Sequence, residues 1–159
     1  MSKLHIYLAL LGFVSIACNE NSTRICEGTE GYPSNIVKVK YGTSFGYCVG
    51  YCWKQIVITP DEINFEKMSR DDNQPVNCDR DFDCTDWIST NQNINLDNFF
   101  KLDEVIGCPD CADGGAAWVE VQTQTKTHKV TFEYMSPPAE ISDVVSDLHE
   151  LMLTFNNCD

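Results

Sequence analysis

Four of the nine cysteines lie in two closely spaced pairs, and this spacing constrains the fold of the 159-residue chain more than any other feature. One pair belongs to residues 45–53 (FGYCVGYCW), which also hold two glycines and four aromatic residues. The other pair belongs to residues 107–115 (GCPDCADGG). A run that favours a β-strand follows each stretch. We therefore predict that both loops are closed by disulfides and lie at one end of a small β-sheet.

The first residues have the features of a signal peptide for export. Lys3 supplies a positive charge, residues 4–14 are apolar but too short to span a bilayer, and small residues end the segment at Ala17. We predict that residues 1–17 are removed. Cys18 then follows, as in bacterial lipoproteins, where the thiol of this cysteine is acylated and anchors the protein to the membrane. The alternative is ordinary cleavage at the same bond, which would leave Cys18 as a free thiol in a secreted protein.

Apart from Cys18 the number of cysteines is even, which suits a disulfide framework in an exported chain. Eight cysteines allow 105 pairings, so the sequence does not fix the connectivity. We favour a local bridge between Cys78 and Cys84 and a bridge between Cys26 and Cys158 near the two ends, with the other four pairing among themselves. The eight expected disulfide cysteines are Cys26, Cys48, Cys52, Cys78, Cys84, Cys108, Cys111 and Cys158.

Two other uses of the cysteines stay open. Two close pairs are also the ligand set of a structural zinc site, but an oxidising compartment favours disulfides, and we expect no metal and no cofactor. Cys108 and Cys111 have the spacing of a thiol–disulfide oxidoreductase, whose first thiol lies at the start of a helix. The sequence ADGG that follows does not favour a helix there. A redox protein or sensor that uses Cys108 and Cys111 is therefore the alternative function.

The chain is strongly acidic, with 24 Asp and Glu against 11 Lys and Arg and a net charge of −13. Nucleic acids and anionic lipid headgroups require surplus basic residues, so we expect neither as a partner. The aspartate-rich residues 69–83 could in principle bind calcium. They lack the regular ligand spacing of a calcium loop, and Arg70 and Arg80 interrupt them. We expect a solvated acidic surface.

The remaining pattern predicts an α+β domain over residues 36–159, preceded by an anchor and tether over residues 18–35. Alternating or β-branched runs predict strands, turn residues between them predict two β-hairpins, and residues 69–83 read as a surface loop. We expect a short helix with Trp87, capped by Thr85 or Asp86, and another helical turn with Leu96, Phe99 and Phe100. The expected strands are residues 36–41, 54–59, 63–68, 116–125 and 128–134.

The C-terminal residues predict a long amphipathic helix. Ser136 is the expected cap and Pro137 the first helical residue. The apolar side chains recur at helical spacing and form a single stripe. We therefore expect an antiparallel sheet of about five strands with this helix packed on one face. The stripe consists of Ile141, Val144, Val145, Leu148, Leu151, Met152 and Phe155.

Rigid aromatic side chains on a cross-linked, glycine-rich loop can form a binding surface at low entropic cost. Tyr47, Tyr51 and Trp53 are the candidate binding residues on this basis. The expected partner is a protein, a peptide or a glycan, and the same loop could instead insert into the active site of a hydrolase as a secreted inhibitor. Aromatic residues that only cover the disulfides are the structural alternative.

The Cys-x-Gly-x-Cys motif formed by Cys48, Gly50 and Cys52, the order of the expected elements and the signal ending at Cys18 together resemble a family of uncharacterised bacterial envelope lipoproteins. The resemblance implies a location in the bacterial cell envelope, in the outer membrane or at the surface, and implies no known activity. We therefore expect a non-catalytic envelope lipoprotein that acts as a binding module.

Overall fold

The structure is a computed structural model that describes residue 26 and residues 35–71, 74–155 and 158. The expected signal peptide, the expected acylation site Cys18 and most of the expected tether over residues 18–35 lie outside these residues.

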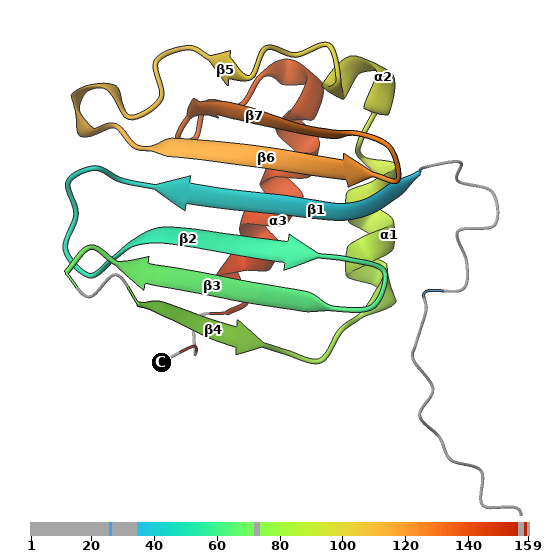
Figure 1. Cartoon of the computed structure of the whole chain (residues 1–159), viewed down its shortest axis with the longest axis horizontal. Helices are drawn as coiled ribbons and strands as arrows, with labels where there is room; N and C mark the ends of the chain where they lie inside the picture. The colour runs from blue at the N-terminus through green and yellow to red at the C-terminus, as the bar shows by residue number, and fades with distance from the viewer. Residues whose placement is uncertain (1–25, 27–34, 72–73, 156–157, 159) are drawn as a thin grey trace, which may run out of the picture.

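The described chain folds around one seven-stranded mixed sheet (Figure 1). The strands follow the order β4-β3-β2-β1-β6-β7-β5 across the sheet. Neighbouring strands are antiparallel, except that β5 runs parallel to β7. The strands are β1 (Ile36–Ser44), β2 (Tyr51–Ile58), β3 (Ile63–Ser69), β4 (Pro75–Asp79), β5 (Val105–Ile106), β6 (Ala116–Thr123) and β7 (Thr127–Glu133).

The α+β class is confirmed, but the expectation of about five antiparallel strands is wrong. The two additional strands, β4 and β5, form the two edges of the sheet. β4 lies within the segment that we predicted as a surface loop, and its residues PVNCD are exposed or only partly buried. β5 has only two residues. Neither edge strand contains a fully buried residue, so neither shows the alternation of apolar and polar residues by which a strand is predicted.

Three α-helices accompany the sheet: α1 (Cys84–Gln92), α2 (Leu96–Phe99) and α3 (Ser142–Leu153). Figure 1 shows α1 and α3 behind the sheet, so that both cover the same face. We call the opposite face of the sheet the open face. No helix of the described chain is long and apolar enough to cross a membrane.

Two expected helix starts are wrong. Asp83, rather than Thr85 or Asp86, caps α1, because its carboxylate accepts a hydrogen bond of 2.9 Å from the backbone N–H of Thr85. The C-terminal helix does not begin at Ser136 and Pro137. Pro138 is extended, with φ −60° and ψ 148°, and a proline disfavours helical geometry in the residue before it. A 3₁₀ turn (Ala139–Ile141) follows, and α3 starts after it.

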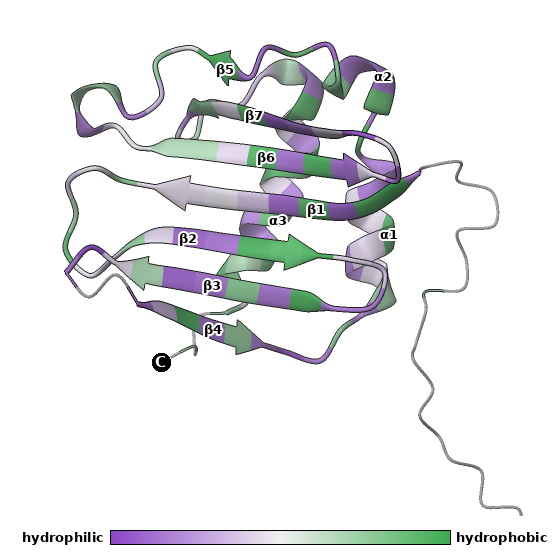
Figure 2. Ribbon diagram, viewed as in Figure 1, coloured by the Kyte–Doolittle hydropathy of each residue, from purple (hydrophilic) through white to green (hydrophobic). Residues whose placement is uncertain are grey.

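The core lies between the sheet and the helices, and it includes Trp87 of α1 and Phe99 of α2 as well as residues of α3. Hydrophobic and hydrophilic residues alternate along the central strands (Figure 2). Each of these strands therefore presents an apolar face to the helices. The predicted apolar stripe is confirmed as core, with Leu151 only partly buried. The buried members of the stripe are Ile141, Val144, Val145, Leu148, Met152 and Phe155.

All eight expected cysteines are paired. The two loop pairs each close on themselves, so Cys48 bonds Cys52 and Cys108 bonds Cys111, which excludes the zinc site. The other two expected bridges, Cys78–Cys84 and Cys26–Cys158, are wrong. Cys78 lies in β4 opposite Phe65 and faces the C-terminal segment, whereas Cys84 begins α1. The observed bridges are Cys78–Cys158 and Cys26–Cys84, with Cα–Cα distances of 6.0 and 5.4 Å.

Candidate functional site

The two cysteine-containing loops lie at the same end of the sheet, as predicted (Figure 1). We call them the Cys48–Cys52 loop (residues 45–52) and the Cys108–Cys111 loop (residues 107–115). The backbone N–H of Gly46 donates a hydrogen bond of 3.2 Å to the carboxylate of Asp110, and Arg70 donates one of 2.7 Å to the carbonyl of Gly46. These bonds join the two loops and the end of β3.

Phe45 packs the same two loops together. Its ring occupies the space that a Cβ atom on Gly115 would need, and Gly115 also has a left-handed φ of 82°. The ring meets that of Tyr134 edge-on, with a centroid distance of 4.8 Å. A glycine at position 115 is therefore required both by the backbone geometry and by the close approach of Phe45.

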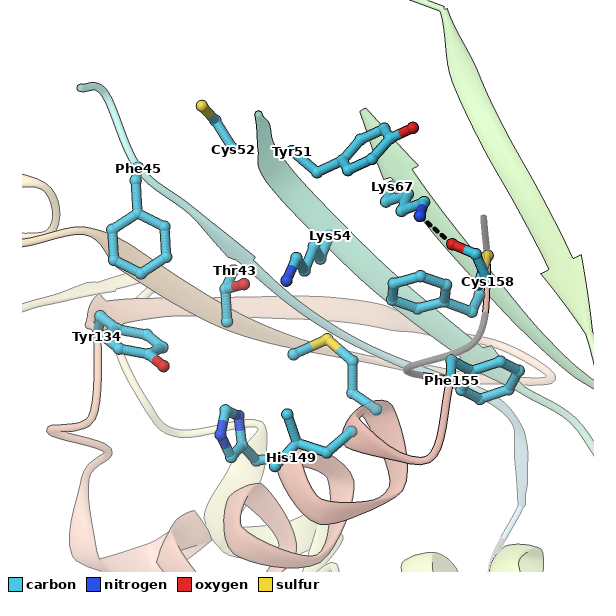
Figure 3. Close-up of a pocket in the computed structure, with 13 residues that line it drawn as sticks. Thr43, Phe45, Tyr51, Cys52, Lys54, Lys67, Tyr134, His149, Phe155 and Cys158 are labelled. Carbon is cyan, nitrogen blue, oxygen red and sulfur yellow. Dashed lines mark hydrogen bonds between the residues drawn. The ribbon is translucent and has the colours of Figure 1, made fainter. Parts of the chain in front are cut away.

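A pocket of about 270 Å³ opens beneath the Cys48–Cys52 loop, between the ends of β1, β2 and β3 and the last turn of α3 (Figure 3). The helix-bearing face of the sheet is left uncovered here, because α3 crosses the sheet closer to its centre. The pocket is lined by Thr43, Phe45, Tyr51, Cys52, Lys54, Phe65, Lys67, Tyr134, His149, Met152, Leu153, Phe155 and Cys158.

Three polar residues form a row across the floor of the pocket. Lys54 is directly opposite Thr43 on β1 and directly opposite Lys67 on β3. Two residues further along each strand, the same face carries Tyr41 on β1, Ile56 on β2 and Phe65 on β3, all buried in the core. The floor therefore changes from apolar to basic at the point where α3 no longer covers it.

The two lysines are held differently. Lys67 is only 7% exposed; its ammonium group donates to the backbone carbonyl of Cys158 and lies 4.1 Å from the centroid of the Tyr51 ring. That position is a cation–π contact. Lys54 is exposed, and Figure 3 shows its amine in the centre of the pocket next to Thr43. Neither lysine takes part in an ion pair within the described chain.

His149 lines the pocket on the helix side and is hydrogen-bonded to Tyr41, which lies behind it. The hydroxyl of Tyr41 lies 3.1 Å from Nδ1 of His149, and the ring of Tyr134 packs edge-on against the imidazole. Burial, and secondarily the proximity of Tyr134, raise the pKa of Tyr41 well above the usual value for tyrosine. The Tyr41 hydroxyl is therefore neutral and acts as a fixed polar group behind the pocket.

The structure does not gather the three predicted aromatic binding residues into one surface. Tyr51, 41% exposed, lines the pocket. Tyr47, 79% exposed, projects from the tip of the Cys48–Cys52 loop. Trp53 lies on the open face, stacked on Trp118 at a ring distance of 5.9 Å. Of the three, only Tyr51 belongs to the pocket.

The Cys108–Cys111 loop does not begin a helix. In thiol–disulfide oxidoreductases a helix that starts at the cysteine pair is one feature that stabilises the thiolate, through the helix dipole. Here a three-residue 3₁₀ turn (Cys111–Asp113) follows, and Ala112 within it has a left-handed φ of 52°. Within the part of the chain that the structure describes, no three His, Cys, Asp or Glu side chains form a group that could hold a metal.

Sequence reasoning missed Lys54, Lys67 and His149 as pocket residues. The two lysines could have been found, because both interrupt the apolar face of a strand: Lys67 follows Ile63 and Phe65 at a spacing of two, and Lys54 precedes Ile56. Nothing in the sequence around His149 distinguishes it from any other polar residue beside a helix stripe.

No family model matches the sequence, and no curated protein matches it. The interpretation of the site therefore depends on its geometry and chemistry.

Proposed function

We propose that this protein is a non-catalytic binding module of the bacterial cell envelope, and that it captures a small ligand in the pocket beneath the Cys48–Cys52 loop. The observation that carries the proposal is the pocket itself, a cavity of about 270 Å³ whose roof is cross-linked and whose walls combine aromatic rings with a few hydrogen-bond donors. Ligand sites in proteins typically have this composition, with apolar walls and a small number of placed polar groups.

The roof of the pocket is preorganised for binding. The Cys48–Cys52 bridge closes the loop on itself, and contacts from Asp110, Arg70 and Gly115 hold it in place. A loop that is already ordered loses little conformational entropy when a ligand binds, which favours affinity. Of the aromatic residues Tyr47, Tyr51 and Trp53, Tyr51 remains a candidate binding residue, because it lines this pocket.

The proposed location is outside the cytosol, in the bacterial cell envelope, with Cys18 acylated as the membrane anchor. Four disulfides support export, because such bridges persist in oxidising compartments and are rare in the cytosol. The resemblance of the Cys-x-Gly-x-Cys loop to envelope lipoproteins supports the same location.

The two alternative functions have less support. A redox role for Cys108 and Cys111 lacks the support of a helix start, which this loop does not provide. A hydrolase inhibitor would use the tip of the Cys48–Cys52 loop, where Tyr47 is well exposed, but it would leave the basic pocket floor without a role.

Chemical-shift mapping by NMR with a chemically diverse fragment mixture tests the proposal. We expect the largest shifts at backbone amides around the pocket, such as Tyr51, Lys54 and Leu153, because ligand rings and charges perturb nearby nuclei. A Leu153→Trp variant, which fills the pocket from its half-exposed wall, should abolish these shifts. Val105→Trp, at another exposed apolar position, on the edge strand β5, is the matched control and should leave them unchanged.

Shifts confined to the tip residues Tyr47 and Val49 would contradict a pocket ligand and favour the inhibitor. Loss of the shifts in both tryptophan variants would show that the pocket plays no specific part.

A further inference from the structure

We infer that the ligand of this pocket is a small organic acid, in which a carboxylate is attached to an apolar body. This inference extends the proposed function, because it names the chemical class of the ligand for the same site. The observation that carries it is the pair of lysines, Lys54 and Lys67, on the floor of the pocket in an otherwise strongly acidic protein. We call these two lysines the basic row.

The charge of the pocket is opposite to that of the protein. The chain has a net charge of −13, yet the described residues that line the pocket include Lys54, Lys67 and His149 and no aspartate or glutamate. On the open face, by contrast, Lys40 forms an ion pair of 2.9 Å with Glu120 directly across from it. The pocket is therefore a local positive site that attracts an anion against the field of the whole protein.

The register of the sheet makes the two lysines neighbours. Lys54 and Lys67 lie directly opposite each other on adjacent antiparallel strands, and like charges in this arrangement repel each other. The same positions next to the core would be filled by apolar side chains if the floor were only structural, as they are at Ile56 and Phe65. An anion between the lysines would relieve the repulsion.

The two lysines would act on the anion in different ways. The amine of Lys67 is committed to the carbonyl of Cys158 and to the Tyr51 ring, so it contributes mainly its charge. The amine of Lys54 is free of ion pairs within the described chain and lies in the pocket next to Thr43, so it is the direct contact (Figure 3). A charge-assisted hydrogen bond from this amine to a carboxylate would fix the orientation of the ligand.

His149 supplies a further polar group. Its Nδ1 is engaged by the Tyr41 hydroxyl at 3.1 Å, so Nε2 is the ring nitrogen left to contact a ligand. This residue lines the pocket on the side opposite the Cys48–Cys52 loop.

The rest of the lining determines the body of the ligand. Apolar and aromatic side chains from the loop, β3 and α3 surround the basic row, and Met152 among them can adapt its shape. The volume of about 270 Å³ is slightly below the range of roughly 300–1,000 Å³ that is usual for ligand sites. A small aromatic or short aliphatic acid therefore fits better than a long lipid chain. The apolar residues are Phe45, Phe65, Met152, Leu153 and Phe155.

Three probes of similar shape test the charge preference by calorimetry and NMR on the oxidised protein: 3-phenylpropanoate, 3-phenylpropanamide and 3-phenylpropylamine. We expect the carboxylate to bind at least about tenfold more tightly than the amide, since a hydrogen bond between charged groups is typically worth that factor or more. The amine should bind most weakly. Acetyl-glycyl-phenylalanine as a fourth probe distinguishes the sources: tighter binding than phenylpropanoate assigns a peptide C-terminus, and weaker binding assigns a free acid.

Substitutions locate the charge effect. Lys54→Gln should weaken carboxylate binding about tenfold and leave amide binding unchanged, and Lys54→Arg should restore most of the loss. Lys38→Gln removes a lysine from the open face of β1 and should have no effect.

Two outcomes would overturn the inference, and they are distinguishable. Equal affinity for the carboxylate and the amide, with shifts at the pocket, would overturn the acid ligand and leave the binding module intact. Absence of pocket shifts with every probe would overturn the acid ligand and the proposed function together.

Discussion

Tyr41 and His149 form a polar contact next to the pocket, and Tyr41→Phe tests its value. The substitution removes the hydroxyl and leaves Nδ1 of His149 without this partner. We expect the free energy of unfolding, measured in urea, to fall by about 1 kcal/mol, the usual net value of one such hydrogen bond. Tyr47→Phe is the matched control, because Tyr47 is exposed, and should leave stability unchanged. Equal stability of both variants would show that the contact contributes nothing.

The same variant has a signature in alkaline solution. Because burial raises the pKa of Tyr41 in the folded state, the unfolded chain loses this proton first as the pH rises. The contribution of Tyr41 to stability is therefore complete below about pH 10, the ordinary pKa of tyrosine, and declines above it. Stability should fall less steeply above pH 10 in Tyr41→Phe than in the unmodified protein. Identical slopes would contradict the buried, neutral state of the hydroxyl.

Single residues show what could be read from the sequence of this site. Lys54 and Lys67 stand at positions where the period of two predicts an apolar residue, and this departure from the strand pattern distinguishes them in the sequence. Tyr51 was identified because of the loop that contains it. Trp53 was placed on the same surface, but successive residues of a strand point to opposite faces, and it belongs to the open face with Trp118.

At the scale of the elements, the two cross-linked loops offer a matched pair of variants. Each bridge closes a ring of similar size, with sequence separations of 4 and 3, so the loss of either should cost about 2 kcal/mol of stability. Only the Cys48–Cys52 bridge lies at the pocket, because Cys52 lines it. We expect Cys48→Ser with Cys52→Ser to weaken binding of 3-phenylpropanoate several-fold, and Cys108→Ser with Cys111→Ser to change it little. Equal weakening in both would mean that the roof has no specific role.

The elements that the sequence predicted well are those with a strong local pattern. The stripe of α3 and the strands β1, β2, β3, β6 and β7 follow from periodicity, whereas β4 and β5 carry almost none because they lie at the edges. The start of α3 was misplaced because Pro137 is a favourable first helical residue only when no second proline follows it. The cap of α1 was misplaced by two residues or more for lack of any local signal that distinguishes Asp83 from its neighbours.

At the scale of the whole molecule, the order of the strands and two of the disulfides could not be predicted. Both hairpins are local features, but their placement on either side of β1 depends on contacts between distant segments. The pocket has the same origin: Tyr41 and His149 are separated by 108 residues, and Lys67 and Cys158 by 91. Local patterns can indicate which residues belong to strands and helices, but they carry no information about which of those elements meet.

The Cys78–Cys158 bridge should contribute more to the stability of the whole fold than either loop bridge. It joins the edge strand β4 to the C-terminal segment across a sequence separation of 80, and a cross-link that closes a longer loop restricts the unfolded chain more. The expected loss for Cys78→Ser with Cys158→Ser is about 4 kcal/mol, against about 2 for the Cys48 and Cys52 double variant.

Urea unfolding of the two double variants under identical oxidising conditions measures this difference. The long-range variant should also lose affinity for 3-phenylpropanoate, because the bridge positions the Cys158 carbonyl that holds Lys67. The Cys26–Cys84 bridge, with a separation of 58, provides the control: its removal should reduce stability by nearly as much but leave binding intact, since neither cysteine lines the pocket. If both long-range variants bound the carboxylate equally, the C-terminal segment would have no part in holding Lys67 in place.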